Sequence, residues 1–256
     1  TPGFSDNLES GTAGWLHSSL SPSFSDQWHL SDTRSFSGEF SWKAGDSGIG
    51  PYANLHDGAL ITPPFLLPER PELTFMHWIE AEGGTSGGSA YDAGIVAISS
   101  GDGQWTQLTP DSGYTHITVD NFSNPLGSDI PCFSGTADWS EVSVDLSAYS
   151  GVVQLMFRFV SDPAVAEEGW YVDDIVVDQA GCCRGIAGNV DGDAEEVVDI
   201  GDLTRLIDYL YISNVEPICP AEANVDGDPD GLVDIGDLTA LVDYLYISTS
   251  PPAPCM

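Results

Sequence analysis

Basic side chains are nearly absent from this chain. The 256 residues include 6 Lys and Arg against 40 Asp and Glu, which gives a formal net charge of −34 at pH 7. Nucleic acids and anionic membranes would repel such a chain, so the composition excludes both as expected partners. Cations that bind the carboxylates would reduce their mutual repulsion, and the same composition therefore favours metal binding.

Long apolar runs and zinc-type cysteine spacings are also missing. No run approaches the roughly 20 apolar residues that a membrane-spanning helix needs, so no membrane insertion is expected. The 5 cysteines include no Cys-x-x-Cys pair and none at zinc spacing from a histidine. Disulfides in an oxidising compartment are favoured over zinc, which predicts a secreted protein. Four cysteines bracket an acidic C-terminal region, and the sequence leaves open whether the fifth, Cys132, is free or paired.

Two short strings match catalytic patterns without the surroundings that catalysis needs. Residues 84–88 (GTSGG) match a nucleophile elbow, and residues 45–48 (GDSG) match the nucleophile string of serine proteases. An elbow requires a strand, a sharp turn and a helix, whereas both strings fall in Gly-rich loops of a β region. The 5 histidines are scattered, and no His-Glu-x-x-His is present. We therefore expect no enzymatic activity.

Residues 1–180 have the pattern of an all-β domain. Val142, Val144 and Leu146 alternate with polar neighbours, as in a half-buried strand. Many short strands without helices predict an antiparallel β-sandwich. The expected strands lie at residues 73–79, 94–99, 115–119, 141–146, 152–160 and 170–177.

Tryptophans in this domain offer an alternative function, because an exposed aromatic face suits a sugar ring. Three of the 7 tryptophans are expected to be exposed: Trp28, Trp42 and Trp105. The other four are expected in the core or at Gly-rich edges: Trp15, Trp78, Trp139 and Trp170. A glycan is therefore the alternative partner.

An internal repeat begins after a Cys-containing linker at residues 181–188. Within residues 189–256, Asn189 recurs as Asn224 and Asp202 recurs as Asp237, both 35 positions later. The strings NVDGD, DIGDLT and DYLYIS each occur in both copies.

Oxygen-bearing side chains at alternate positions of each repeat predict one calcium ion per copy. Calcium binds six to eight oxygen ligands, and a loop of this pattern can curl so that its side chains converge. The candidate ligands are Asn189, Asp191, Asp193, Asp199 and Asp202, and then Asn224, Asp226, Asp228, Asp234 and Asp237. Asp199 and Asp234 could ligate directly, through water, or not at all. Gly192 and Gly227 would relieve the backbone where each loop turns sharply.

A helix is expected directly after each loop. Each carries an apolar stripe at helical spacing, and the two helices are expected to pack against each other. The stripes are Leu203, Leu206, Ile207, Leu210 and Tyr211, and Leu238, Leu241, Val242, Leu245 and Tyr246.

The tandem Asn-x-Asp-x-Asp loops and Asp-Leu-Thr helices resemble a type I dockerin over about residues 187–256. Such domains plug catalytic chains into cohesin partners in cellulosomes, so the resemblance implies a small α-helical docking domain. Each loop here is two residues longer than the twelve-residue pattern. The family's recognition positions fall on Ile200-Gly201 and Asp208-Tyr209, and on Ile235-Gly236 and Asp243-Tyr244. These departures favour a partner other than a cellulosomal cohesin, or other copies of this chain.

The cysteines fit the ends of the repeats as staples. Cys182 and Cys183 precede the first loop, while Cys219 and Cys255 each follow a helix. We predict that one or both of the first pair bridge to the latter two.

Motifs at both ends of the β domain resemble another family. FSDNLESG at residues 4–11 and EGWYVDDIVV at residues 168–177 resemble jelly-roll domains appended to bacterial immune inhibitor A-type secreted proteases. Those domains are similar in outline to MAM domains and carbohydrate-binding modules. The resemblance implies a further calcium ion held by Glu9 with Asp173 or Asp174, and Asp6 is an additional candidate. Because strand side chains alternate between faces, Asp173 and Asp174 are not expected to reach one ion together.

Taken together, the sequence predicts a mainly β chain: an antiparallel jelly-roll sandwich followed by a small helical dockerin-like domain with two calcium loops. The expected function is that of a secreted, non-catalytic structural or interaction protein of prokaryotic origin, extracellular or on the cell surface. Its tail would build an extracellular, filamentous assembly with a protein partner or with other copies. The alternatives are a carbohydrate-binding adhesion module and the C-terminal accessory region of a secreted protease.

Overall fold

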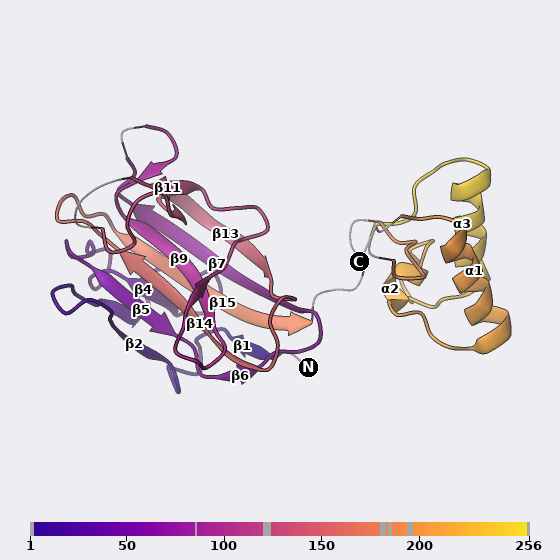
Figure 1. Ribbon diagram of the computed structural model, residues 1–256, viewed down its shortest axis with the longest axis horizontal. Helices are drawn as coiled ribbons and strands as arrows, with labels where there is room; N and C mark the ends of the chain where they lie inside the picture. The colour runs from indigo at the N-terminus through magenta and orange to yellow at the C-terminus, as the bar shows by residue number, and fades with distance from the viewer. Residues whose placement is uncertain are drawn as a thin grey trace. The chain divides into compact units, whose positions relative to one another are not determined.

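The chain forms two compact units, Thr1–Ala180 and Gly181–Met256. Figure 1 shows the computed structural model, which describes residues 3–84, 86–119, 124–179, 183, 186–193 and 197–254. Among these residues, no helix is both long enough and apolar enough to span a membrane.

The first sheet of the N-terminal unit has six antiparallel strands. Five are hydrogen-bonded in the order β13-β7-β15-β4-β3, and β1 pairs with the far part of β15. Their bounds are β1 (Phe4–Asp6), β3 (Trp28–Ser31), β4 (Ser41–Ala44), β7 (Pro71–Ala81), β13 (Gly135–Asp145) and β15 (Gly169–Gln179).

The second sheet lies against the first and also has six antiparallel strands. Its order is β10-β9-β14-β5-β2, with β6 paired to β14. Their bounds are β2 (Leu16–Ser19), β5 (Asp57–Ile61), β6 (Phe65–Leu66), β9 (Ala93–Ser99), β10 (Thr106–Gln107) and β14 (Val152–Val160). A small third sheet joins β12 (Pro131–Cys132), β11 (His116–Thr118) and β8 (Ser89–Ala90). The predicted mainly β, antiparallel architecture is confirmed.

Aromatic side chains fill the space between the two large sheets. Trp170 and Phe157 come from opposite sheets, and their ring centroids lie 6.0 Å apart. Phe75 meets Phe157 edge-on at 5.1 Å. Both Trp170 and Phe157 are fully buried, so this contact lies at the centre of the core.

The predicted exposure of three tryptophans is wrong for two of them. Trp28 and Trp42 are only 1% and 2% exposed. Trp28 is held inside by a hydrogen bond from its Nε1 to the Gly58 carbonyl oxygen, at 3.1 Å. Trp105 is partly buried and packs on the outer side of the second sheet. Each ring is covered by strands distant in the sequence, which local spacing does not reveal.

The C-terminal unit is built on two helices that share one small core. Helix α1 (Ile200–Asp208) continues into the π-helical turn η1 (Tyr209–Ser213), a short α2 (Pro220–Ala223) follows, and α3 (Ile235–Tyr246) ends the series. The helices pack through a buried cluster formed by Val190, Leu206, Ala223, Val225 and Leu241.

The ends of the two predicted apolar stripes do not reach this core. Tyr211 and Tyr246 are 63% and 60% exposed. Tyr211 lies in the π-helical turn, whose wider winding rotates side chains away from the α-helical stripe. Tyr246 is the last residue of α3.

Candidate metal centres

The two repeat loops fold in the same way, and each closes on a buried aspartate at the start of the following helix. Asp202 is fully buried; its Oδ1 accepts the Asp191 N–H at 3.0 Å and its Oδ2 accepts the Asp199 N–H at 2.8 Å. Asp237 makes the equivalent contacts in the second copy, at 3.2 and 2.8 Å. Burial raises the pKa of both carboxyl groups.

The first residues of each loop are organised around one backbone N–H. The Asp193 N–H donates to Asn189 Oδ1 and to Asp191 Oδ1, both at 3.1 Å. Asp228 repeats this arrangement toward Asn224 and Asp226, at 3.2 and 3.1 Å. The loops are therefore curled with their oxygen atoms turned inward, as a cation-binding loop requires.

Glycine is needed at two kinds of position in these loops. Gly192 and Gly227 have φ values of +70° and +68°, in the region that the sharp turn was expected to use. A Cβ at Gly201 would lie 2.5 Å from Asp191 Oδ2, and one at Gly236 would lie 2.5 Å from Asp226 Oδ2. Glycine is therefore required at both positions, since the loop carboxylate occupies the space of a larger side chain.

Asp199 acts as the N-cap of α1, since its Oδ1 accepts the Gly201 N–H at 2.6 Å. Asp234 caps α3 in the same way. Each cap forms a reciprocal pair with the buried aspartate three residues later, which is a capping box. The caps already use one carboxylate oxygen on the helix backbone.

We expect Asp199→Ala to lower the stability of the C-terminal unit without removing a calcium ion. Loss of an N-cap costs about 1 kcal/mol, which lowers the melting temperature of a unit of this size by about 4–8 °C. Calorimetric titration should still count the wild-type number of ions. A missing ion would show that Asp199 is itself a ligand.

Glu222 holds the start of the first loop, a contact that the spacing of the repeats did not predict. It is 5% exposed, lies in α2, and its Oε2 accepts the Asn189 N–H at 3.1 Å. The second repeat thereby holds the start of the first loop. The signal available in the sequence was a lone acidic residue between two alanines, two positions before Asn224.

The acidic residues predicted in the sandwich meet the segment between β3 and β4. Glu9 Oε1 accepts the N–H groups of Glu39 and Phe40 at 2.8 and 2.9 Å. Asp173 is fully buried, and its Oδ2 accepts the N–H groups of Phe36 and Ser37 at 2.8 and 3.2 Å. Burial raises the pKa of Asp173. Glu9 and Asp173, both predicted from the sequence, thus contact the same segment between β3 and β4. A shared ion stays a prediction.

Asp6 and Asp174 each accept hydrogen bonds that fix the local backbone or a neighbouring segment. The two oxygens of Asp6 accept the Leu8 N–H and the Trp15 indole N–H, both at 2.8 Å, so Asp6 fixes the first turn. Asp174 has φ +44° within an irregularity of β15, and its Oδ1 accepts the Ser37 hydroxyl at 2.7 Å. Asp173 and Asp174 both contact Ser37, because the bulge breaks the alternation of the strand, and the expectation that they do not reach one ion together stays a prediction.

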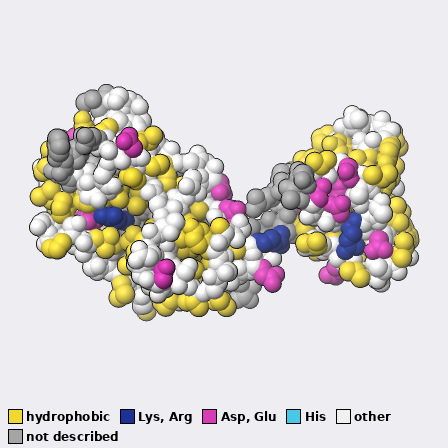
Figure 2. Space-filling model, in the orientation of Figure 1, with side chains coloured by type: hydrophobic (Ala, Val, Ile, Leu, Met, Phe, Trp, Pro, Cys, Tyr) yellow, Lys and Arg dark blue, Asp and Glu magenta, His cyan; other side chains and the backbone are white. Residues whose placement is uncertain are grey.

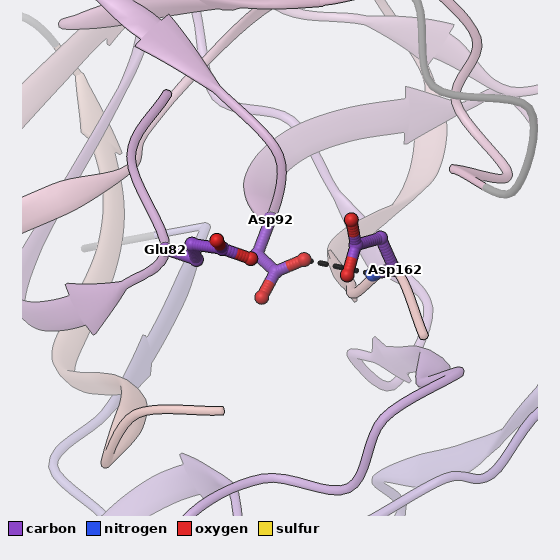
Figure 3. Close-up of side chains that lie close together, drawn as sticks. All are labelled: Glu82, Asp92 and Asp162. Atoms are coloured by element: carbon purple, nitrogen blue, oxygen red, sulfur yellow. Dashed lines mark hydrogen bonds between the residues drawn. The ribbon is translucent and has the colours of Figure 1, made fainter. Parts of the chain in front are cut away.

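A third group of carboxylates was not predicted at all. Glu82, Asp92 and Asp162 place their oxygen atoms within 4.8 Å of one another (Figure 3). Across the described ranges this is the one such group of three or more acidic, histidine or cysteine side chains. Among the described residues, the repeat-loop carboxylates form no group as close as this one.

The two catalytic-looking strings have structural explanations. The loop at residues 45–48 wraps around the side chain of Lys43, whose Nζ donates to the carbonyl oxygens of Asp46, Gly48 and Gly50 at 2.6, 2.6 and 2.9 Å. In the other string, Ser86 lies in a turn before β8, and Thr85 is outside the described residues. Neither string lies between a strand and a helix.

The predicted disulfide pattern is only partly within the described residues. Cys182 and Cys255 lie outside them, while Cys219 caps α2 by accepting the Glu222 N–H. Ile186 and Pro254 form an antiparallel bridge, so the two ends of the C-terminal unit lie side by side. The predicted staples stay a prediction. Cys132 is buried and free, and burial raises the pKa of its thiol to about 12.

Comparison with known proteins finds relatives among bacterial proteases. Bacillopeptidase F of Bacillus subtilis is 28% identical over 184 residues, which are 69% of this chain and 11% of that protein. The pre-pro-metalloprotease PrtV of Vibrio cholerae is 32% identical over 83 residues, or 28% of this chain and 9% of that protein. The chain thus spans about a tenth of the length of the curated relatives it matches. No family model matches it.

Two solved structures are similar over most of their own length. TmCBM61, determined with β-1,4-galactotriose, is 11% identical with a TM-score of 0.41, covering 68% of this chain and 94% of that one. The K3 cleaved adhesin domain of Lys-gingipain from Porphyromonas gingivalis is 18% identical with a TM-score of 0.43, covering 69% and 97%.

Proposed function

We propose that this chain is an extracellular, non-catalytic interaction module whose C-terminal unit binds two calcium ions and docks onto a protein partner or onto other copies. The observation that carries this proposal is the duplicated loop geometry. Two sites 35 residues apart share the buried aspartate, the curled side chains and the glycine that makes room for them.

A calcium ion would supply the positive charge that the buried loop carboxylates lack. Asp202 and Asp237 are buried at 0% exposure, and their hydrogen-bond donors are neutral backbone groups. Their raised pKa values result chiefly from burial, and a nearby loop aspartate adds to the effect in each copy. A divalent cation bound by these oxygen ligands would offset both the cost of burying the carboxylate and its repulsion from the nearby aspartate.

A docking role is supported by the apolar surface of the C-terminal unit. In Figure 2 hydrophobic side chains, in yellow, spread over its visible face with acidic side chains between them. Equivalent residues of the two repeats share this exposure: Ile200 and Ile235 at 63% and 55%, and Ile212 and Ile247 at 76% and 73%. Apolar side chains exposed at equivalent positions of both repeats support an interaction role for this unit.

Light scattering and electron microscopy of the purified chain, with calcium and then with a chelator, test the docking proposal. Self-association should appear with calcium and disappear with the chelator. Monomers under both conditions would exclude assembly from copies and leave docking onto a foreign protein. Matched substitution of Ile212 and Ile247 by serine should abolish the association while leaving the helical circular dichroism unchanged.

Glycan binding by the sandwich is a second candidate function. A cleft of about 290 Å³ in the first sheet is lined by Phe36, Met76, Glu141 and Asp174, among others. Phe36 is 51% exposed, and its ring lies 6.1 Å from that of Trp139. An aromatic face beside carboxylate acceptors suits a neutral sugar. A glycan array tests this: binding that Phe36→Ala abolishes would support it, and an array without signal would exclude it.

An accessory region of a larger protease is a third candidate, favoured by the similarity to Bacillopeptidase F over 69% of this chain. The relevant test is genetic context: a protease domain encoded in the same reading frame supports this role. A reading frame without one would leave the module acting alone.

A further inference from the structure

Three carboxylates converge at one end of the sandwich from both of its large sheets. Glu82 directly follows β7 of the first sheet, Asp92 directly precedes β9 of the second, and Asp162 follows β14 next to it. Figure 3 shows the Asp92 carboxylate lying between Glu82 and Asp162. The topology gathers them, since they are separated by 10 and 70 positions in the sequence (92 − 82 and 162 − 92).

Asp92 is buried at the centre of this group with only neutral donors. It is 0% exposed; its Oδ2 accepts the Tyr52 hydroxyl at 2.6 Å and its Oδ1 accepts the Asp162 N–H at 2.7 Å. Burial is the main cause that raises the pKa of Asp92 to about 8, and the charges of Asp162 and Glu82 add to it. Like charges buried together are unfavourable unless a counter-charge joins them.

Glu82 provides a second and independent sign of a missing ligand. Its Oε2 is shielded from solvent and has no hydrogen-bond partner among the described residues. In Figure 3 the Glu82 carboxylate extends toward Asp92. The charges that act on it, from Asp162 and Glu167, are both negative. A buried acceptor without a donor, beside other carboxylates, fits an ion.

We propose that Glu82, Asp92 and Asp162 bind a calcium ion that joins the two sheets of the sandwich. Calcium–oxygen distances are 2.3–2.6 Å, so two ligands on opposite sides of the ion lie at most about 5 Å apart. The observed spread of the oxygen atoms, within 4.8 Å, fits that limit. All three donors are carboxylates, whereas zinc sites favour nitrogen and sulfur. Magnesium requires a tighter octahedron and retains its waters.

This site is independent of the repeat loops, so its test begins from a chain in which those loops are silenced by Asp202→Asn and Asp237→Asn. Equilibrium dialysis with calcium is then compared for Glu82→Gln and for the matched control Glu80→Gln, which removes the same charge two residues earlier on the strand. We expect Glu82→Gln to bind one ion fewer than the control, or to bind it at least about 100-fold more weakly. Equal binding by the two variants would overturn the proposal.

Melting of the sandwich provides a second readout that does not depend on one variant. In the loop-silenced chain, calcium at 100 times its Kd should raise the melting temperature by about 5–10 °C. Asp92→Asn preserves the shape and removes the like-charge repulsion, but it has one acceptor oxygen for the two donors that Asp92 satisfies, so without calcium it should melt close to the parent temperature. Its response to calcium should also be smaller than that of the parent by the contribution of one ion. A calcium response as large as the parent's in both Asp92→Asn and Glu82→Gln would contradict the site, because any ion held by Glu9 and Asp173 contributes equally to parent and variants.

Discussion

Replacement of both Asp202 and Asp237 by alanine is expected to unfold the C-terminal unit at every calcium concentration. Each aspartate is fully buried and accepts two backbone N–H groups that pin its loop to its helix. Loss of one such side chain removes two hydrogen bonds and costs roughly 3–6 kcal/mol, because hydrogen bonds to charged groups contribute about 1.5–3 kcal/mol each. A unit of this size with so small a core has little stability in reserve. Helical circular dichroism of the full chain measures the loss.

Asparagine and a surface variant separate the two roles of these residues. Asp202→Asn with Asp237→Asn retains one acceptor oxygen at each site, so the helices should persist while calcium affinity falls by at least about 100-fold. Glu216→Gln removes one charge from an exposed side chain and should change neither property. If the double alanine variant kept native helicity and native calcium affinity, the aspartates would be neither anchors nor ligands.

Lys43→Met is expected to produce the largest single-residue loss in the sandwich other than damage to the aromatic core. Lys43 is fully buried, donates to three carbonyl oxygens and lies with its ammonium 5.3 Å from the centre of the Tyr171 ring. Burial lowers the pKa of Lys43, while the negative charges of Glu168 and Asp46 oppose that effect. Methionine retains the apolar stem and leaves the carbonyl cage without donors. We expect a loss of about 3 kcal/mol, or about 6–12 °C in melting temperature.

A matched control for Lys43→Met is Arg70→Met, which removes one positive charge from an exposed position. Its effect on the unfolding free energy should be within about 0.5 kcal/mol. Equal losses from the two variants would show that overall charge balance, and not the carbonyl cage, makes Lys43 important. Chemical denaturation of the two variants beside the parent chain gives the comparison.

The features that could be predicted from the sequence are those that depend on the spacing of residues close together in the chain. Within residues 152–160, Val153, Leu155, Phe157 and Phe159 recur at every second position, and the segment forms β14 with the same bounds. The repeat is visible because Asn189 and Asp202 recur at constant offset, and the structure places the equivalent residues in equivalent contacts. Both signals depend on neighbours within a dozen residues.

The features that sequence missed depend on distant strands or on a break in regular geometry. Asp174 contacts the same segment as Asp173 because a bulge, in which Asp174 has φ +44°, interrupts the alternation of side chains between the two faces of the strand. Trp28 and Trp42 look like exposed platforms until the strands that cover them are known. The group of Glu82, Asp92 and Asp162 exists only because three strand ends from two sheets meet.

Calcium dependence of the C-terminal unit is most directly tested by thermal unfolding of the full chain, followed through the helical signal, in calcium and in a chelator. Two sites saturated at 100 times their Kd contribute about 5 kcal/mol to the stability of the folded unit. We therefore predict that the chelator lowers the helical melting temperature by at least about 20 °C or abolishes the helices outright. A helical transition at the same temperature in both solutions would contradict calcium binding by the repeats.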